Sequence, residues 1–393
     1  MALTQLWKNT QDELKEKHVQ QVISFAGKGK LSDGGPTSKE FRDFLALVPS
    51  VFLARYADEC LKEKFDGSGF ALQDVINEVG KRLGFQVEQG KYRGIQGQIG
   101  FDGLWRALDG NAIVVEVKTT DAYRIVLDTI AVYRRKLIAD GKITEGKSSI
   151  LIVVGRNDTG ELEAQVRGSR HAWDVRLISI DALVRLMRLK EELEDPKIME
   201  KIRRVLMPQE FTKIDGIIDL VFSAAEEVKK DEELPDVGDA AEDGGGAKKP
   251  KFVPTNFRDA CAERVQKRLG KPLVKQSLAV YSSPDQKVTV VCINSREYQE
   301  GSYVKYWFAF HPHQQELLKT QKGGYVAFGC GSVDSLLLIP ACDFLPWLDM
   351  CGKTELEDRF YWHIRITKDS DGFLFRVKKG FKAIELNKYL LEA

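Results

Sequence analysis

The chain has 393 residues, of which 43% are hydrophobic and 30% are charged, a composition typical of a globular protein with two domains. It is long enough to bury a sizeable core, so folding requires neither disulfides nor a structural metal. Its 59 Lys and Arg residues nearly balance 58 Asp and Glu residues, giving a formal net charge of +1. This balance argues against a protein that merely coats nucleic acid, although a local basic groove remains compatible with it.

The six cysteines are spread over the whole sequence, and none forms a C-x-x-C pair. This pattern is typical of free thiols in a reducing compartment and argues against a disulfide scaffold or a zinc site. The N-terminal residues lack the basic start and apolar core of a signal peptide. No run of about 18 apolar residues predicts a membrane-spanning helix. We therefore expect a cytoplasmic protein with no membrane partner.

Helix and strand patterns alternate in the first half of the chain. Residues 4–23 and 38–62 predict helices, the second with Ser38 as an N-cap. Residues 70–83 have apolar side chains at helical spacing and predict an amphipathic helix. The strands expected after it are 85–91, 100–108, 112–118, 149–154 and 175–180. The other expected helices are 122–139, which Asp121 would cap, 161–173 and 181–194. The order predicts an α/β domain with helices flanking a mixed sheet.

A boundary is expected at residues 225–254, which are rich in charge, Gly, Ala and Pro and have almost no large apolar side chain. Such a segment cannot bury enough apolar surface to order itself, so it predicts a flexible linker. Residues 1–224 then form the N-terminal part, with a domain core at about 70–194. Residues 255–393 form a smaller C-terminal domain, α+β or mostly β. Its expected elements are a helix at 256–269 and strands at 287–293, 304–310, 324–328, 335–339, 360–366 and 373–378.

Three polar residues stand out against the strand pattern of the first half. Side chains alternate along a strand, so Glu116 and Lys118 should share one face while Val115 faces the core. A short turn should bring Asp102 of the neighbouring strand beside Glu116. Mg²⁺ is held by one or two carboxylates plus waters and phosphate oxygens. Asp102 and Glu116 could therefore bind Mg²⁺, with Mn²⁺ as a substitute, while Lys118 offsets negative charge that develops on a phosphate.

At these residues the chain resembles the PD-(D/E)XK nuclease superfamily, which includes many restriction endonucleases. The match is Asp102 followed by Glu116-Val117-Lys118, and the resemblance covers roughly residues 70–194. Phe101 replaces the proline of the motif. The resemblance implies a restriction-endonuclease-like fold and an additional acid from the preceding helix, for which Glu78 is the candidate and Asp74, one turn earlier, the alternative. A Gln-x-x-x-Tyr motif of some exonuclease branches is not evident, which favours an endonuclease. The alternative is a salt bridge between Glu116 and Lys118 on an exposed strand.

Several basic and aromatic residues are candidates for contact with nucleic acid. Lys91, Tyr92 and Arg93 lie in a Gly-rich segment before Asp102, which could contact DNA or simply connect two strands. Two further sets also have alternative interpretations. Arg167, Arg170 and His171 could bind phosphates or form a solvated helix face, and Tyr303 and Trp307 could stack on a base or belong to the core of a small β domain.

Together these features predict a Mg²⁺-dependent endonuclease that hydrolyses phosphodiester bonds of duplex DNA. The resemblance implies a role in restriction or anti-phage defence, and a homodimer with one site for each strand. The C-terminal domain would recognise the substrate, a partner or a trigger. One alternative is a catalytically idle nuclease fold that acts as a nucleic-acid-binding sensor or scaffold. Another is a nuclease that acts on RNA or on branched repair DNA.

Overall fold

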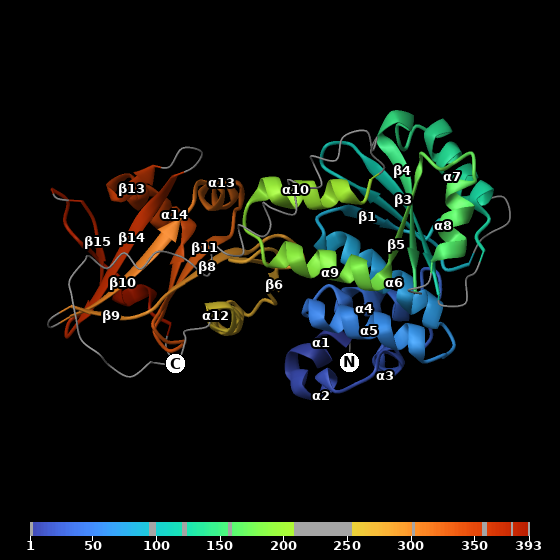
Figure 1. Ribbon diagram of the computed structural model, residues 1–393. Helices are drawn as coiled ribbons and strands as arrows, with labels where there is room; N and C mark the ends of the chain where they lie inside the picture. Colours follow the sequence, from blue (N-terminus) through green and yellow to red (C-terminus); the bar gives the residue numbers. More distant parts are fainter. Residues whose placement is uncertain are drawn as a thin grey trace, which may run out of the picture. The chain divides into compact units, whose positions relative to one another are not determined.

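The computed structural model describes residues 3–93, 100–119, 124–155, 159–207, 254–300, 303–355, 360–378 and 380–391. The chain divides into two compact units, shown in Figure 1. The N-terminal unit is Met1–Leu193 with Lys197–Glu226, and the C-terminal unit is Glu194–Pro196 with Glu227–Ala393. The predicted linker lies outside the described residues except for Pro254. Among the described residues, no helix is long and apolar enough to cross a membrane.

The N-terminal unit begins with helices that pack on one another and, through the last of them, on one face of a sheet. They are α1 (Leu3–Asn9), α2 (Gln11–Lys15), α3 (Val19–Phe25), α4 (Pro36–Leu45), α5 (Ser50–Lys62) and α6 (Ser68–Arg82). The single helix expected at 4–23 is wrong, because the His18 N–H is capped by the Gln21 side chain and a new helix begins there. The N-cap expected at Ser38 is also wrong. Helix α4 begins at Pro36, and the Ser38 hydroxyl bonds the main chain of Ser32 instead.

The sheet of the N-terminal unit has the order β1-β2-β3-β4-β5. Its strands are β1 (Gln86–Gln89), β2 (Gly103–Arg106), β3 (Ala112–Lys118), β4 (Ser148–Val154) and β5 (Val175–Ser179). Strands β1, β2 and β3 are antiparallel neighbours, whereas β3, β4 and β5 run parallel. The remaining helices are α7 (Leu127–Ala139), α8 (Gly160–Arg167), α9 (Ile180–Glu191) and α10 (Pro196–Val205). The predicted mixed sheet and order of elements from α6 to α9 are confirmed. The helix expected at 122–139 starts later, and its expected cap, Asp121, lies outside the described residues.

Both faces of this sheet are buried, and strand β3 contributes alternate side chains to each. Ile113 and Val115 pack with Trp105 and α6 on one face, whereas Val114 packs with α7 on the other. Figure 1 shows α6 and α9 on one side of the sheet and α7 and α8 on the opposite side. Burial decreases towards the carboxyl end of β3, where Glu116 is the first residue of the strand that is only partly buried. Polar side chains therefore leave the core at the carboxyl end of β3.

The C-terminal unit contains two sheets that share an apolar core. The first, β12-β11-β8-β7-β6, comprises β6 (Val274–Lys275), β7 (Val280–Ser282), β8 (Thr289–Ser295), β11 (Gly324–Cys330) and β12 (Leu336–Pro340). The second, β16-β15-β14-β10-β9 with β13 also paired to β14, comprises β9 (Tyr298–Glu300), β10 (Tyr303–Phe310), β13 (Gly352–Glu355), β14 (Phe360–Asp369), β15 (Gly372–Arg376) and β16 (Ile384–Glu385). Helices α13 (Pro312–Thr320) and α14 (Ala341–Phe344) add to the shared core.

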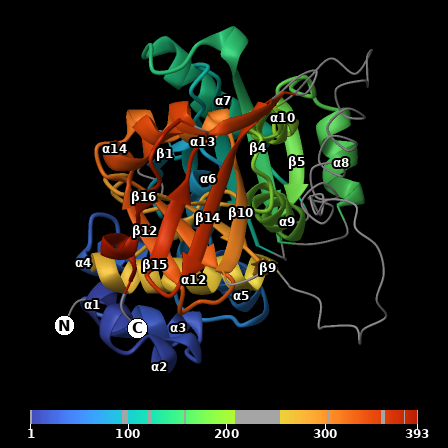
Figure 2. The same ribbon diagram turned by 90° about the vertical axis from the view of Figure 1, so that its left-hand side faces the viewer.

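Helix α12 (Pro254–Leu269) packs on the other face of the first sheet through Cys261 and Val265. Figure 2 looks towards the second sheet, with β10, β14 and β15 in the foreground. In β10 the side chains of Tyr306, Phe308 and Phe310 are buried, while Trp307 is only partly buried. The chain is thus a mixed α/β protein.

Candidate active site at the end of β3

Asp102 lies immediately before β2 and is fixed against β3 by both its main chain and its side chain. Its N–H donates to the Val115 carbonyl at 3.1 Å, and its Oδ2 accepts from the Val117 N–H at 2.7 Å. The second bond places the Asp102 carboxylate beside the carboxyl end of β3, next to Glu116. The expected juxtaposition of these two acids is therefore present in the structure.

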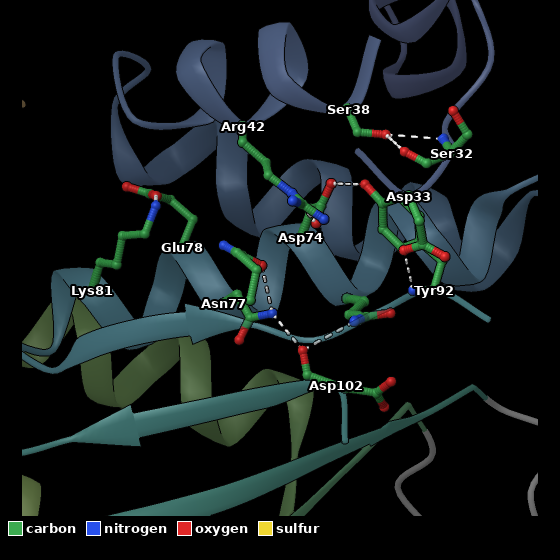
Figure 3. A network of polar contacts seen from close by, with 12 residues as sticks. Ser32, Asp33, Ser38, Arg42, Asp74, Asn77, Glu78, Lys81, Tyr92 and Asp102 are labelled. Atoms are coloured by element: carbon green, nitrogen blue, oxygen red, sulfur yellow. Dashed lines mark hydrogen bonds and ion pairs between the residues drawn. The ribbon is translucent and has the colours of Figure 1, made fainter. Parts of the chain in front are cut away.

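Helix α6 holds the main chain of Asp102 from the opposite side (Figure 3). The side-chain amides of Gln73 and Asn77 each donate to the Asp102 carbonyl at 2.9 Å. Asn77 Oδ1 in turn accepts from the Trp105 indole at 2.8 Å. A Cβ at Gly103 would lie 2.2 Å from Asn77 Oδ1, so a larger residue there would displace the Asn77 side chain from its hydrogen bonds. Gln73 and Asn77 are positioning residues that the sequence analysis missed.

The sequence carried little signal for these two residues. Their spacing of four positions places them on one face of α6, beside the apolar stripe of Leu72, Val75, Ile76 and Val79 and not within it. Both are almost completely buried. Buried amides nearly always have hydrogen-bond partners, but helical spacing did not predict that these two would be buried.

Glu116 and Lys118 lie on the same side of β3, as the alternation predicts. Lys118 Nζ donates to Glu116 Oε1 at 2.5 Å. The Glu116 side chain is only 12% exposed, and its second oxygen, Oε2, is buried without a hydrogen-bond partner among the described residues. Lys118 is 32% exposed. The salt bridge of the alternative interpretation is therefore present, but it is only partly exposed, because Glu116 Oε2 is buried.

The proximity of the two acids is visible in the pKa of Asp102, which is raised to about 7. Burial is the main cause and the negative charge of Glu116 is the second, whereas the Val117 N–H and Lys118 act in the opposite direction. A carboxyl group with such a pKa changes its charge near neutral pH, so its ionisation would respond to a cation bound beside it.

The donor set fits a divalent cation held partly by water. Two adjacent carboxylates, one with a buried oxygen that has no partner in the described part of the chain, match the hard oxygen ligands of Mg²⁺. Within the described residues there is no group of three or more His, Cys, Asp or Glu side chains that could hold a metal. Asp102 and Glu116 would therefore supply two ligands and leave the other positions to water and substrate.

Glu78, expected as an additional acid, is turned away from this site. Its carboxylate pairs with Arg82 Nε at 3.2 Å and Lys81 Nζ at 3.0 Å within α6. In Figure 3 it points towards Lys81 and not towards Asp102. Arg82 is itself buried and donates to two main-chain carbonyls of the helical segment, so this pair belongs to helix packing. We therefore leave Glu78 out of the candidate site.

The second acid of α6, Asp74, lies one turn earlier and is also fully buried. It accepts from Arg42 Nε at 2.8 Å and from the Tyr92 hydroxyl at 2.5 Å. Burial raises the pKa of Asp74 to about 6, although Arg42 and Tyr92 oppose the shift. Asp74 thus ties Tyr92, one of the predicted nucleic-acid-binding residues, to the helix that holds Asp102.

The other residues expected to bind nucleic acid are Lys91 and Arg93, then Arg167, Arg170 and His171, and finally Tyr303 and Trp307. Lys91 and Arg93 are exposed on either side of buried Tyr92. Arg167 is exposed at the end of α8, while Arg170 and His171 contact Asp128 at 2.7 and 2.8 Å. The exposed Arg170–Asp128 pair matches the solvated-surface interpretation, whereas the His171 side chain is only 15% exposed.

Tyr303 and Trp307 lie in β10 of the C-terminal unit. The Tyr303 hydroxyl donates to Glu300 at 2.8 Å, and the Trp307 indole donates to His363 Nδ1 at 3.0 Å. The neighbouring Tyr306, Phe308 and Phe310 are core residues, as the strand alternation predicts. Stacking of Trp307 or Tyr303 on a base stays a prediction.

No protein-family model matches the chain, and no curated protein matches it. The functional interpretation therefore depends on the geometry of the site.

Proposed function

We propose that the N-terminal unit is a Mg²⁺-dependent nuclease of the PD-(D/E)XK type that hydrolyses DNA. The observation that carries the proposal is the cluster at the end of β3, where Asp102 and Glu116 are adjacent, Glu116 Oε2 is buried without a described partner, and Lys118 lies beside them. The order of a helix, three antiparallel strands, a helix and a parallel strand around this cluster supports the same assignment.

The reaction adds water across a phosphodiester, so one P–O bond forms while the bond to the leaving sugar oxygen breaks. When bound, Mg²⁺ polarises the phosphate and lowers the pKa of a coordinated water. Asp102 and Glu116 hold the negative charge that binds the cation. Lys118 Nζ donates to Glu116 and, being partly exposed, can also donate to a phosphate oxygen as negative charge develops on it. Gln73 and Asn77 keep the Asp102 main chain in place.

By resemblance, we further propose an endonuclease of restriction or anti-phage defence that works as a homodimer. The rival functions are a catalytically idle binding protein and a nuclease for RNA or branched repair DNA. They differ from the proposal in what the purified full-length chain does to its substrates.

The test is an incubation of full-length protein with supercoiled plasmid, linear duplex, branched junction and RNA, each with Mg²⁺, Mn²⁺ or a chelator. We expect metal-dependent nicking or linearisation of plasmid that Asp102→Asn abolishes. Asp109→Asn, in the exposed turn between β2 and β3, is the matched control and should cut normally. Metal-dependent cleavage of RNA or junctions alone would show that one of these, and not duplex DNA, is the substrate. Tight binding without cleavage of any substrate would favour the catalytically idle binding protein.

A further inference from the structure

A cavity of about 320 Å³ lies in the N-terminal unit beside Tyr92. It is formed by the α3–α4 connection, the start of α6 and the segment that follows β1. Its lining residues include the cationic residues Lys28, Lys30 and Arg93, the aromatic residues Phe70 and Tyr92, and Ser32. None of these residues contributes to the Asp102–Glu116–Lys118 cluster described above, so the cavity is a second feature of the same unit.

The aromatic wall of the cavity is rigid. The rings of Phe70 and Tyr92 stack with centroids 4.7 Å apart and an interplanar angle of 21°. The Tyr92 hydroxyl is held by Asp74, and its main-chain N–H donates to Asp33 Oδ1 at 2.8 Å. The Arg42 guanidinium lies 5.1 Å from the centre of the Tyr92 ring. A fixed aromatic surface with a partly exposed ring, Phe70, is suited to contact a flat or apolar group of a ligand.

The rim of the cavity is positively charged. Lys28, Lys30 and Arg93 contribute three cations, against one lining carboxylate, Asp33, which accepts from the main-chain N–H groups of Tyr92 and Arg93. Lys30 pairs with Asp66 at 2.9 Å, but both side chains are largely exposed. Such a pair contributes little to stability and is readily exchanged for a stronger anion.

The cavity and the candidate active site share helix α6. Asp74, which holds the Tyr92 hydroxyl, follows Gln73, which holds the Asp102 carbonyl. Figure 3 shows Tyr92, Asp74 and Asp102 around this helix. A group bound against Tyr92 would therefore contact the same rigid element that positions Asp102.

We propose that this cavity binds one nucleotide unit of a nucleic-acid strand, with a phosphate at Lys28, Lys30 and Arg93 and the base or sugar against Phe70. The volume is at the lower end of the range for small-molecule sites, about 300–1,000 Å³, which fits a single unit and not a longer segment. The inference deepens the proposed function, because it assigns a strand-binding subsite to the same nuclease unit.

The experiment measures binding of labelled single-stranded and duplex oligonucleotides to full-length protein in Ca²⁺, over a series of salt concentrations. Lys28→Ala and Arg93→Ala should each weaken binding several-fold. For each phosphate that a variant no longer neutralises, the slope of log affinity against log salt should fall by about 0.7 for a single strand or 0.9 for a duplex. Phe70→Leu keeps an apolar side chain but removes the ring, and it should weaken single-strand binding about fivefold or more. Lys39→Ala, an exposed lysine of α4 outside the cavity, is the matched control.

A second measurement separates a strand from a free nucleotide. A nucleoside monophosphate and inorganic phosphate are titrated as competitors against the oligonucleotide. Displacement of the labelled oligonucleotide by unlabelled oligonucleotide, but by neither of these two small molecules, supports the strand assignment. Displacement by micromolar nucleoside monophosphate, lost in Lys28→Ala, would overturn the strand assignment and identify a free nucleotide as the ligand.

The outcomes distinguish this inference from the proposed function. If wild-type protein cuts DNA but Lys28→Ala, Arg93→Ala and Phe70→Leu bind as Lys39→Ala does, the inference is overturned and the nuclease stands. If nothing is cut but these three variants still bind more weakly, the nuclease is overturned and the subsite stands. If wild-type protein binds neither oligonucleotide nor nucleotide, the subsite is overturned.

Discussion

Two polar clusters lie among apolar strands, one in each unit, and their hydrogen-bonding differs: the cluster at His363 is fully hydrogen-bonded, whereas the one at Glu116 is not. In the C-terminal unit, His363 accepts from the Trp307 indole at 3.0 Å, and its other ring nitrogen lies 2.6 Å from the Thr354 hydroxyl. In the N-terminal unit, Glu116 Oε2 is buried without a partner among the described residues, and the neighbouring Asp102 carboxyl has its pKa raised to about 7.

The comparison distinguishes a polar cluster that is fully hydrogen-bonded within the fold from a buried carboxylate that is not. A network whose members bond one another stabilises a fold and needs no ligand. A buried carboxylate oxygen without a partner costs about 1–3 kcal/mol or more, and a second acid beside it adds like-charge repulsion. A divalent cation would relieve both costs, which is why we place function at the end of β3 and not at Trp307.

The largest expected effect is loss of cleavage on removal of either acid of the candidate site. Asp102→Ala and Glu116→Ala each remove a predicted metal ligand, so cleavage of plasmid should fall below detection while circular dichroism shows an intact fold. Calorimetry should show weakened Mg²⁺ binding in both. Full activity in either variant would contradict the assignment, and Asp109→Ala should behave as wild type.

Removal of Lys118 should have a smaller and different effect. Lys118→Ala deletes a positive group but no metal ligand, so cleavage should fall by about a hundredfold or more, the scale of losing a main electrostatic stabiliser. Mg²⁺ affinity measured by calorimetry should change little. A variant that loses metal binding or unfolds would show that Lys118 has a structural role instead.

The raised pKa of Asp102 predicts a pH dependence of stability. Because the folded-state pKa, about 7, lies above the unfolded value, about 3.9, the contribution of Asp102 is complete below pH 4 and is lost as the pH rises towards 7. Asp102→Asn should abolish this loss. This loss is measured by comparing the melting temperatures of wild-type protein and Asp102→Asn at pH 5 and pH 8 without metal. Asp74, whose pKa is about 6, contributes equally in both proteins.

Wild-type protein should therefore fall behind Asp102→Asn in melting temperature between pH 5 and pH 8. Added Mg²⁺ should restore the wild-type protein at pH 8 and leave the variant unchanged. Equal pH profiles for the two proteins would refute the electrostatic account of the site.

The smallest effect should come from the satisfied network of the C-terminal unit. His363→Ala removes the hydrogen-bond partner of both the Trp307 indole and the Thr354 hydroxyl, so the free energy of unfolding should fall by about 2 kcal/mol, the typical net value of two hydrogen bonds. Metal-dependent cleavage should not change. Denaturant unfolding measures the change in stability, and the plasmid assay measures cleavage. A large loss of cleavage would show that His363 contributes to the catalytic site.

The amino-acid sequence alone determined the features that depend on local periodicity. The alternation along β3 assigned Ile113 and Val115 to one face and Glu116 and Lys118 to the other, and the helical spacing at 70–83 located α6. The short hairpin brought Asp102 beside Glu116. These features could be predicted because side-chain direction in a strand or helix is set by neighbouring residues.

Only the tertiary structure decided which buried polar group finds which partner. Glu78 pairs with Arg82, and Asp74 pairs with Arg42 and Tyr92, although both acids had similar positions in the sequence pattern. Arg42 is 32 residues from Asp74, and Gln73 is 29 residues from Asp102. No local period encodes such pairings, because a buried polar group bonds whatever segment packing brings within about 3 Å of it.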